Sequence, residues 1–500
     1  MQKLSYEVLK NQNYNGYLLE KAPEKVLQFG EGNFLRAFAD YFIDMMNEKA
    51  DFNGKVVVVQ PRAKRSQHTI ADSLNEQEGL YTLYLRGFEN GKKVNDKRII
   101  SCISRCLNSH ADFEEVMKCA ENPELRYIIS NTTEAGIVYD ASCQFTDKPA
   151  ASFPGKLTQF LYHRFEIFGR ETGKGFILLP CELIDDNGIA LKECVLKYAA
   201  QWNLGDDFIH WIEAENTFCS TLVDRIVTGY PTNEISSLTE ENGYEDEALT
   251  TGEVFGFWAI EGPEWLNEEL PFRKANLPVI VTDNQKPYKK RKVRILNGAH
   301  TSMVLGAYLA GQDIVRNCME DDIIRGYMNK AIYEEIIPTI DLPKDELENF
   351  AFSVTERFKN PFIDHSLLAI ALNSTSKWKA RVLPTVKDFI KQTGTLPKCL
   401  TTSFALYIAF YHNGKELDEK GLHAVRKDGT QYVISDDRFV LEFYYAHKDD
   451  SARDLAFVVC QNTEFWGEDL SQIKGLAEMV ADTLETIEAE GTWQVMKNCL

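Results

Sequence analysis

The chain changes its hydrophobic pattern a little past its middle, and this change constrains the fold more than any single motif does. In the first half, short apolar runs alternate with segments of helical pattern; the runs include KVLQFG, KVVVVQP, RYIISNTTEAG and KGFILLPCELI. Such alternation predicts a parallel sheet with crossover helices. Later segments, such as TSMVLGAYLAGQD and SKWKARVLPTVKDFIKQ, carry apolar residues at helical spacing. We therefore expect an α/β domain over residues 1–285 and a mostly α-helical domain over residues 286–500.

Composition excludes several classes of protein. The 500 residues are 44% hydrophobic and 26% charged, which is ordinary for a globular chain. The net charge of −20 argues against nucleic-acid binding, because phosphate contacts need a basic face. No stretch approaches the roughly 18 apolar residues of a membrane span. Neither nucleic acid nor a membrane is therefore an expected partner.

The eleven cysteines indicate a reducing environment. Their number is odd and they are spread thinly along the chain, which is unlike a disulfide framework. Cys102 and Cys106 are the closest pair, but no second pair of cysteines or histidines follows nearby in the sequence to complete a zinc site. We expect a cytoplasmic protein that binds no metal.

The segment VLQFGEGNFLRAF, residues 26–38, has most of a dinucleotide-binding fingerprint. A strand is expected to end at Phe29, and a helix that continues through NFLRAFADYFIDMMNEK is expected to begin near Asn33, where free N–H groups can bind a pyrophosphate. Leu35 replaces the third glycine, so a purely structural turn is the alternative. The flanking strand and helix favour a Rossmann-type domain. The expected cofactor contacts are Phe29, Gly30, Gly32, Asn33 and Phe34.

The second strand, in VVVVQPRAKR, ends without the acidic residue that usually binds the adenosine ribose. Gln60 occupies this position, and its amide can also hydrogen-bond a hydroxyl. The basic residues that follow, Arg62, Lys64 and Arg65, could instead accept a 2′-phosphate. Local chemistry therefore leaves both NAD and NADP open.

The segment KKRKVRILNGAHTS, residues 289–302, places basic residues directly before an apolar helix. On a regular α-helix, Lys292, Asn297 and His300 lie within an arc of roughly 140°. A lysine of lowered pKa can move the proton of an alcohol that is oxidised to a ketone. Asn297 can donate a hydrogen bond to the developing alkoxide, and His300 can orient the substrate.

Like charge favours the neutral form of a lysine, so the neighbours of Lys292 bear on its role. These neighbours are Lys289, Lys290, Arg291 and Arg294. The alternative interpretation is a solvated basic turn followed by an ordinary core histidine.

These motifs resemble those of the polyol-specific long-chain dehydrogenases, the mannitol dehydrogenase family. KVRILNGAH is similar to the K-x4-N-x2-H signature of that family, and GEGNFLRAF is similar to its nucleotide-binding turn. The segments NTTEAGI, LPCELIDDNG and NPFIDHSLLAIALNSTSKWKARVLP follow in the family's order. The resemblance implies a catalytic Lys292 with Asn297 and His300 as partners, no metal, and NAD as cofactor. It implies further cofactor contacts at Asn131, Thr132 and Thr133.

Two departures from the mannitol-type pattern suggest a different substrate. Leu183 stands where an asparagine that contacts the sugar is expected, and Ala369 stands where an arginine is expected, while Lys377 is kept. Three stretches resemble members that act on a keto-uronate, so the resemblance implies interconversion of D-tagaturonate and D-altronate. The alternatives are a reductase of D-fructuronate, a mannitol-type dehydrogenase, or a non-catalytic dinucleotide sensor.

A sugar acid brings a carboxylate that must be bound by a cation or by N–H donors. His365 stands four residues before Ala369, on the same face if that helix is regular. We expect His365 or Lys377 to bind the carboxylate, assisted by the positive field of residues 289–294. Glu182 is a further expected substrate contact.

Overall fold

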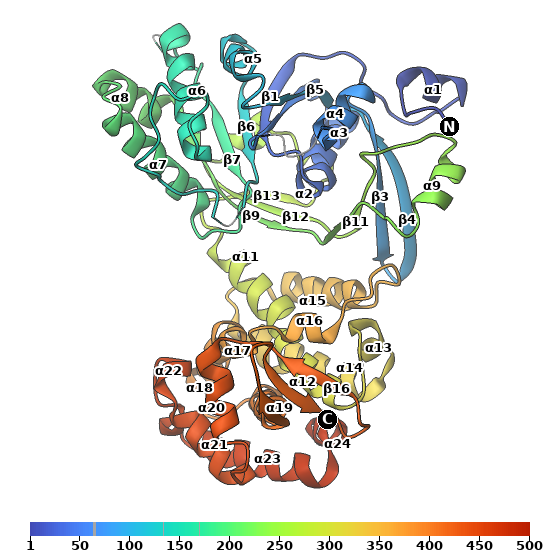
Figure 1. Ribbon diagram of the computed structural model, residues 1–500, viewed down its shortest axis with the longest axis vertical. Coiled ribbons are helices and arrows are strands. Elements are labelled where there is room, and N and C mark those ends of the chain that lie inside the picture. The colour runs from blue at the N-terminus through green and yellow to red at the C-terminus, as the bar shows by residue number, and fades with distance from the viewer. Residues whose placement is uncertain (64–66, 134, 170) are drawn as a thin grey trace. The chain divides into compact units, whose positions relative to one another are not determined.

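The computed structural model describes residues 1–63, 67–133, 135–169 and 171–500 and divides the chain into two compact units (Figure 1). The N-terminal unit contains residues 1–86 and 93–285, and the C-terminal unit contains residues 87–92 and 286–500. The N-terminal unit is an α/β structure and the C-terminal unit is mostly helical, which confirms the predicted fold class. The assignment of residues 87–92, a hairpin tip, to the C-terminal unit has no counterpart in the sequence pattern.

A six-stranded parallel sheet forms the centre of the N-terminal unit, in the order β5-β2-β1-β6-β7-β8. Its strands are β1 (Glu24–Phe29), β2 (Lys55–Gln60), β5 (Ile103–Asn108), β6 (Tyr127–Ser130), β7 (Ile177–Pro180) and β8 (Thr217–Phe218). β2 is buried along its whole length, as in parallel sheets with both faces covered. The strand order reverses between β1 and β6. In doubly wound sheets, ligands bind at the carboxyl ends of the strands at such a reversal.

The remaining elements of the N-terminal unit surround this sheet or form two smaller sheets. The helices are α1 (Tyr6–Asn11), α2 (Asn33–Ala37), α3 (Ala39–Ala50), α4 (Ile70–Glu76), α5 (Phe113–Lys118), α6 (Phe153–Phe168), α7 (Asn187–Gln201), α8 (Asp206–Glu215), α9 (Ile235–Asn242) and α10 (Leu266–Glu269), with a 3-10 turn at Cys119–Glu121. One small sheet has the order β10-β11-β3-β4 and the other β13-β12-β9. Their strands are β3 (Tyr81–Glu89), β4 (Lys92–Ile100), β9 (Ser220–Asp224), β10 (Val227–Gly229), β11 (Thr250–Glu253), β12 (Phe257–Glu261) and β13 (Val279–Thr282).

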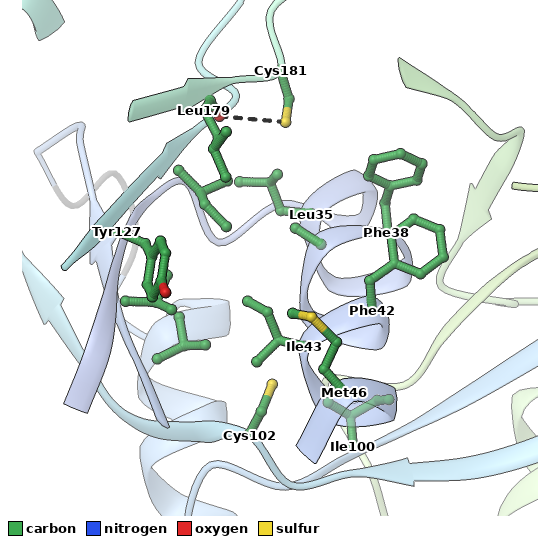
Figure 2. Packing of buried hydrophobic residues seen from close by; sticks show 14 of the residues in the cluster. Leu35, Phe38, Phe42, Ile43, Met46, Ile100, Cys102, Tyr127, Leu179 and Cys181 are labelled. Carbon is green, nitrogen blue, oxygen red and sulfur yellow. Dashed lines mark hydrogen bonds between the residues drawn. The ribbon is translucent and has the colours of Figure 1, made fainter. Parts of the chain in front are cut away.

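The helix after the glycine turn is broken in two, although the sequence pattern predicts one helix. Phe38, with φ −126° and ψ −79°, separates α2 from α3. Its ring is buried against Phe42, 4.9 Å between centroids, and against Trp258, 5.3 Å between centroids. Figure 2 shows how Leu35, Phe38 and Phe42 pack in one cluster with Tyr127 of the sheet. The break is therefore explained by tertiary packing, which cannot be predicted from the helical spacing of apolar residues.

The C-terminal unit is built from many short helices. They are α11 (Lys286–Arg291), a π-helix (Lys292–Asn297), α12 (Gly298–Leu309), α13 (Val315–Glu320), α14 (Asp322–Lys330), a second π-helix (Ala331–Ile336), a 3-10 turn (Ile337–Thr339), α15 (Lys344–Phe358), α16 (Leu367–Ala371), α17 (Ser374–Arg381), α18 (Leu383–Thr393), α19 (Lys398–His412), α20 (Arg438–Ala446), α21 (Ala452–Gln461), α22 (Thr463–Trp466), a 3-10 turn (Leu470–Gln472), α23 (Leu476–Glu490) and α24 (Thr492–Cys499). α19 is buried from Cys399 to Tyr411 and lies at the core of this unit.

The C-terminal unit also contains a small antiparallel sheet that the sequence pattern does not predict. Its strands are β14 (Gly414–Leu417), β15 (Leu422–Val425) and β16 (Gln431–Ile434). Each is only four residues long, too short for a clear alternation. Among the helices of the described residues, none combines the length and apolar character needed to cross a membrane.

Candidate active site

The glycine turn follows β1 at the point where the strand order reverses. Gly30 adopts φ +127°, and its N–H donates to the Val59 carbonyl oxygen at 3.0 Å. A Cβ at Gly30 would lie 3.1 Å from the Asn131 carbonyl oxygen, so both the backbone and the space require glycine. Gly32 has an ordinary φ of −65° and caps α2 without a side chain. The first-turn N–H groups of α2 are thus left without a side-chain cap, as an anion site requires.

The side chains that flank the Gly30–Gly32 turn, Phe29, Asn33 and Phe34, contact other residues of the N-terminal unit. The Phe29 and Phe153 rings lie 5.2 Å apart, and Phe34 stacks on Phe38 at 5.0 Å. The Asn33 side-chain oxygen accepts a hydrogen bond from the Arg36 guanidinium at 2.6 Å. The turn therefore presents backbone atoms and the Glu31 side chain for a ligand.

Glu182 forms hydrogen bonds with the end of β6 and with the loop that follows it. This loop contains the predicted cofactor contacts at residues 131–133. One carboxylate oxygen accepts from the Thr132 N–H at 3.0 Å and from the Thr132 hydroxyl at 3.1 Å. The other oxygen accepts from the Ser130 hydroxyl at 3.0 Å. Burial raises the pKa of the Glu182 carboxyl, while these hydrogen bonds favour its ionised form. Both oxygens of this predicted substrate contact are directed at the β6 loop.

Gln60 ends β2, as predicted, but its amide is already hydrogen-bonded on both sides. Its Nε2 donates to Glu31 Oε1 at 3.1 Å, and its Oε1 accepts from Asn108 Nδ2 at 2.8 Å. Lys64 and Arg65, considered above as phosphate ligands, lie outside the described residues.

Lys292, Asn297 and His300 lie on one continuous helical segment, but this segment is not a regular α-helix. Lys292 to Asn297 form a π-helical turn between α11 and α12. In a π-helix, hydrogen bonds run from i to i+5, so residues five apart lie roughly one turn apart. Asn297 and His300 are then three apart at the start of α12, on adjacent positions of one face. The predicted α-helical arc is therefore wrong, and the π turn brings Lys292 and Asn297 closer to one face than an α-helix would.

His300 is buried in an aromatic and cationic environment. Its ring stacks on Phe358 with 3.9 Å between centroids and contacts the edge of the His365 ring at 5.5 Å. Its Nε2 is buried and has no hydrogen-bond partner among the described residues. Burial, and then the charges of His365, Arg357, Arg381 and Lys377, lower the pKa of His300 well below its usual value. His300 is thus a neutral imidazole with one unused ring nitrogen.

The basic run before the helix is largely neutralised by acidic residues. Arg294 lies 2.7 Å from the Asp388 carboxylate and Lys290 lies 3.4 Å from it. Arg291 is buried and pairs with Glu346. The run is therefore not a solvated turn, and the positive field expected from residues 289–294 is offset by these carboxylates.

Two other cations near His300, Lys377 and Arg381, are less fully compensated, since only Lys377 has an acidic neighbour that acts on its charge, Asp436. Lys377 and Arg381 lie one turn apart on α17 and are half-buried, and burial lowers the pKa of each. Lys377 donates to the Ile370 carbonyl oxygen at 2.9 Å, and Arg381 makes a 3.5 Å contact with the Thr301 hydroxyl. Within the described residues, neither forms an ion pair. Arg381 was not among the predicted site residues; its signal in the sequence is its spacing of four from Lys377.

The expectation that His365 and Ala369 share a helical face is wrong. α16 begins at Leu367, with Ser366 as its N-cap, so His365 precedes the helix. His365 nevertheless reaches the site, because its ring contacts His300. Leu183 and Ala369, the two departures from the mannitol-type pattern, are both exposed, and Leu183 is 63% exposed.

One surface group of the described residues has the donor types of a metal site. His68, Glu76 and Glu247 lie close together and are exposed. Lys3 already contacts both carboxylates, 3.5 Å from Glu247. The group is an ion-pair cluster whose negative charge is partly balanced.

Comparison with known proteins assigns both units of the chain to one family. The Rossmann domain of mannitol dehydrogenase matches residues 24–274, and the C-terminal domain of mannitol dehydrogenase matches residues 284–488. The chain belongs to the mannitol dehydrogenase family. Its members are dehydrogenases, so the prediction of an enzyme acting on a CH–OH group is confirmed at this level.

Similar sequences, and solved structures with the same fold, cover nearly the whole chain. Altronate oxidoreductase of Shigella flexneri is 46% identical over 98% of this chain and 99% of its own length. That of Escherichia coli O6:K15:H31 is 45% identical over the same shares. A D-sorbitol dehydrogenase structure has a TM-score of 0.83 at 21% identity, covering 99% of this chain and 100% of that one. Mannitol 2-dehydrogenase of Pseudomonas fluorescens, solved with NAD and D-mannitol, has a TM-score of 0.67 at 22% identity and covers 99% of both.

Proposed function

We propose that this chain is a cytoplasmic, metal-independent, NAD-dependent oxidoreductase that interconverts D-tagaturonate and D-altronate. The altronate oxidoreductases at 46% and 45% identity support this substrate pair, since the match spans both units. All eleven cysteines are unpaired and buried, which agrees with a reducing compartment.

The dinucleotide is proposed to bind at the carboxyl ends of β1 and β6. Gly32 supports this, because among the described residues no atom other than those of its chain neighbours lies within 4 Å of the position a Cβ would take there. A pyrophosphate can therefore approach the backbone at the start of α2. NAD supplies or accepts the hydride at the carbon that bears the substrate oxygen.

In the proposed reduction, Lys292 donates the proton that converts the substrate's keto oxygen to a hydroxyl. The Asn297 amide donates a hydrogen bond to that oxygen as negative charge develops on it. His300 stays neutral, so its unused Nε2 can hydrogen-bond a substrate hydroxyl without adding a charge beside Lys292. In the oxidation, Lys292 accepts the proton.

A sugar acid rather than a neutral polyol is favoured by one observation: within the described residues, neither of the half-buried cations Lys377 and Arg381 forms an ion pair, although the charge of Asp436 acts on Lys377. A cation taken from water needs an opposite charge or several hydrogen bonds to offset its lost hydration. The substrate carboxylate can provide this charge, and its two oxygens match the fork of the guanidinium. We assign carboxylate binding to Arg381 and Lys377, with His365 as a neighbour.

The proposal is tested by following NADH absorbance with D-tagaturonate and with its epimer D-fructuronate, and by following NAD reduction with D-altronate and D-mannitol. We expect efficient turnover of D-tagaturonate and D-altronate. Preference for D-fructuronate would make the enzyme a fructuronate reductase. Preference for D-mannitol would contradict a sugar-acid substrate.

A further inference from the structure

The glycine turn places an acidic residue beside the end of β2, which ends in Gln60. The parallel register pairs Phe29 of β1 with Val59 of β2, so the residues that follow these two strands are neighbours. Glu31, the middle residue of the Gly30-Glu31-Gly32 turn, is thereby placed beside Gln60 and accepts its amide N–H at 3.1 Å. Glu31 is half-exposed.

The Gln60 amide is used to position Glu31, so it is not free to bind a ribose hydroxyl itself. Its oxygen accepts from Asn108, the last residue of β5, at 2.8 Å, and this fixes the amide so that its NH2 group faces Glu31. Asn108 in turn donates to the Arg62 carbonyl oxygen at 2.9 Å. The chain Asn108, Gln60, Glu31 therefore ends in a carboxylate, and its second oxygen makes no hydrogen bond within the described residues.

We propose that Glu31 selects NAD over NADP. In dinucleotide-binding folds of this type, an acid at the end of the second strand accepts hydrogen bonds from the adenosine ribose hydroxyls. Glu31 can accept the same bonds from a neighbouring position, and its charge repels the 2′-phosphate of NADP. This inference rests on the proposed use of a dinucleotide, but not on the identity of the sugar substrate.

The test measures binding of NADH and NADPH directly, by nucleotide fluorescence, in wild type, Glu31→Gln, Glu31→Asp and the control Glu124→Gln. Glu124 is an exposed acid elsewhere in the same unit. We expect Glu31→Gln to shift the ratio of NADPH to NADH affinity by at least about 10-fold toward NADPH, because a charge-assisted hydrogen bond and a repulsion are both lost. Glu31→Asp, which keeps the charge, should retain the NADH preference, and Glu124→Gln should resemble wild type.

An unchanged ratio in Glu31→Gln, with NADH still bound, would overturn the assignment of Glu31 while leaving the proposed reaction intact. Binding of neither nucleotide by the wild-type protein would overturn the inference and the proposed function together. Because no sugar is present, a wrong substrate assignment cannot produce either result.

Discussion

Lys292 and Asn297 are the first and the last residue of a single π-helical turn. A spacing of five aligns two side chains poorly on an α-helix but places them about one turn apart on a π-helix. π turns are rare and are found mostly at functional sites. The π turn therefore accounts for the spacing of five between Lys292 and Asn297. The second π-helix, at Ala331–Ile336, has no polar residue at either end.

Moving the lysine by one position tests this alignment. We expect Lys292→Val combined with Val293→Lys to lose turnover by about 100-fold or more, like Lys292→Ala, which removes the general acid. Affinity for NADH should stay close to wild type in both variants. On a regular α-helix, a lysine at position 293 would be four residues from Asn297 and well aligned with it. Activity of the double variant within about 10-fold of wild type would therefore contradict the π-turn account.

The two glycines of the nucleotide turn should respond differently to alanine. Gly30→Ala should destabilise the protein by about 1 to 3 kcal/mol, because φ +127° is unfavourable for any side chain and the added Cβ meets the Asn131 carbonyl oxygen. Gly32→Ala should leave the thermal midpoint unchanged and weaken NADH binding, because its Cβ meets open space that the pyrophosphate is proposed to use. Thermal unfolding and NADH titration of both variants check this. Equal NADH affinity in Gly32→Ala and wild type would place the pyrophosphate elsewhere.

Asp40 on α3 should make stability depend on pH. Burial raises the pKa of this carboxyl from 3.8 to about 7, against the opposing effects of Gln28 and Arg36. The folded protein keeps the proton up to about pH 7, whereas the unfolded chain releases it near pH 3.8. The resulting stabilisation is complete below pH 3.8 and is lost as pH rises through 7, by up to roughly 4 kcal/mol.

Asp40→Asn cannot titrate, so its stability relative to wild type should increase between pH 4.5 and pH 8. Urea unfolding at several pH values measures this difference. Parallel pH profiles for the two proteins would show that Asp40 ionises normally in the folded state.

Local features of the sequence predicted the fold and the glycine turn of the candidate site. The order of apolar runs identified the parallel sheet, and Gly30 with Gly32 identified the turn at its strand reversal, because both signals lie within a few adjacent residues. The spacing of Lys292, Asn297 and His300 also identified the helix that carries them. The backbone geometry of that helix was predicted wrongly, because the pattern of apolar residues does not distinguish an α turn from a π turn.

The features that were missed depend on contacts between distant segments. The position of Glu31 depends on its hydrogen bond with Gln60, which ends a different segment of the chain, strand β2. Arg381 approaches His300 only because α17 packs on α12, where Gly298 lies against the Arg381 carbonyl oxygen. Likewise, the sequence alone does not show that Asp388 and Glu346 lie beside the basic run and offset its positive charge.

The most direct test of the sugar-acid assignment compares D-tagaturonate with D-tagatose, in which a hydroxymethyl group replaces the carboxylate. Reduction of both by NADH gives two values of kcat/KM under identical conditions. We expect the value for D-tagaturonate to be at least about 100-fold higher, because D-tagatose offers no carboxylate to Lys377 and Arg381. Arg381→Met should narrow this difference by lowering the value for D-tagaturonate alone. Equal kcat/KM for the two sugars in the wild-type enzyme would contradict the account and indicate a polyol dehydrogenase.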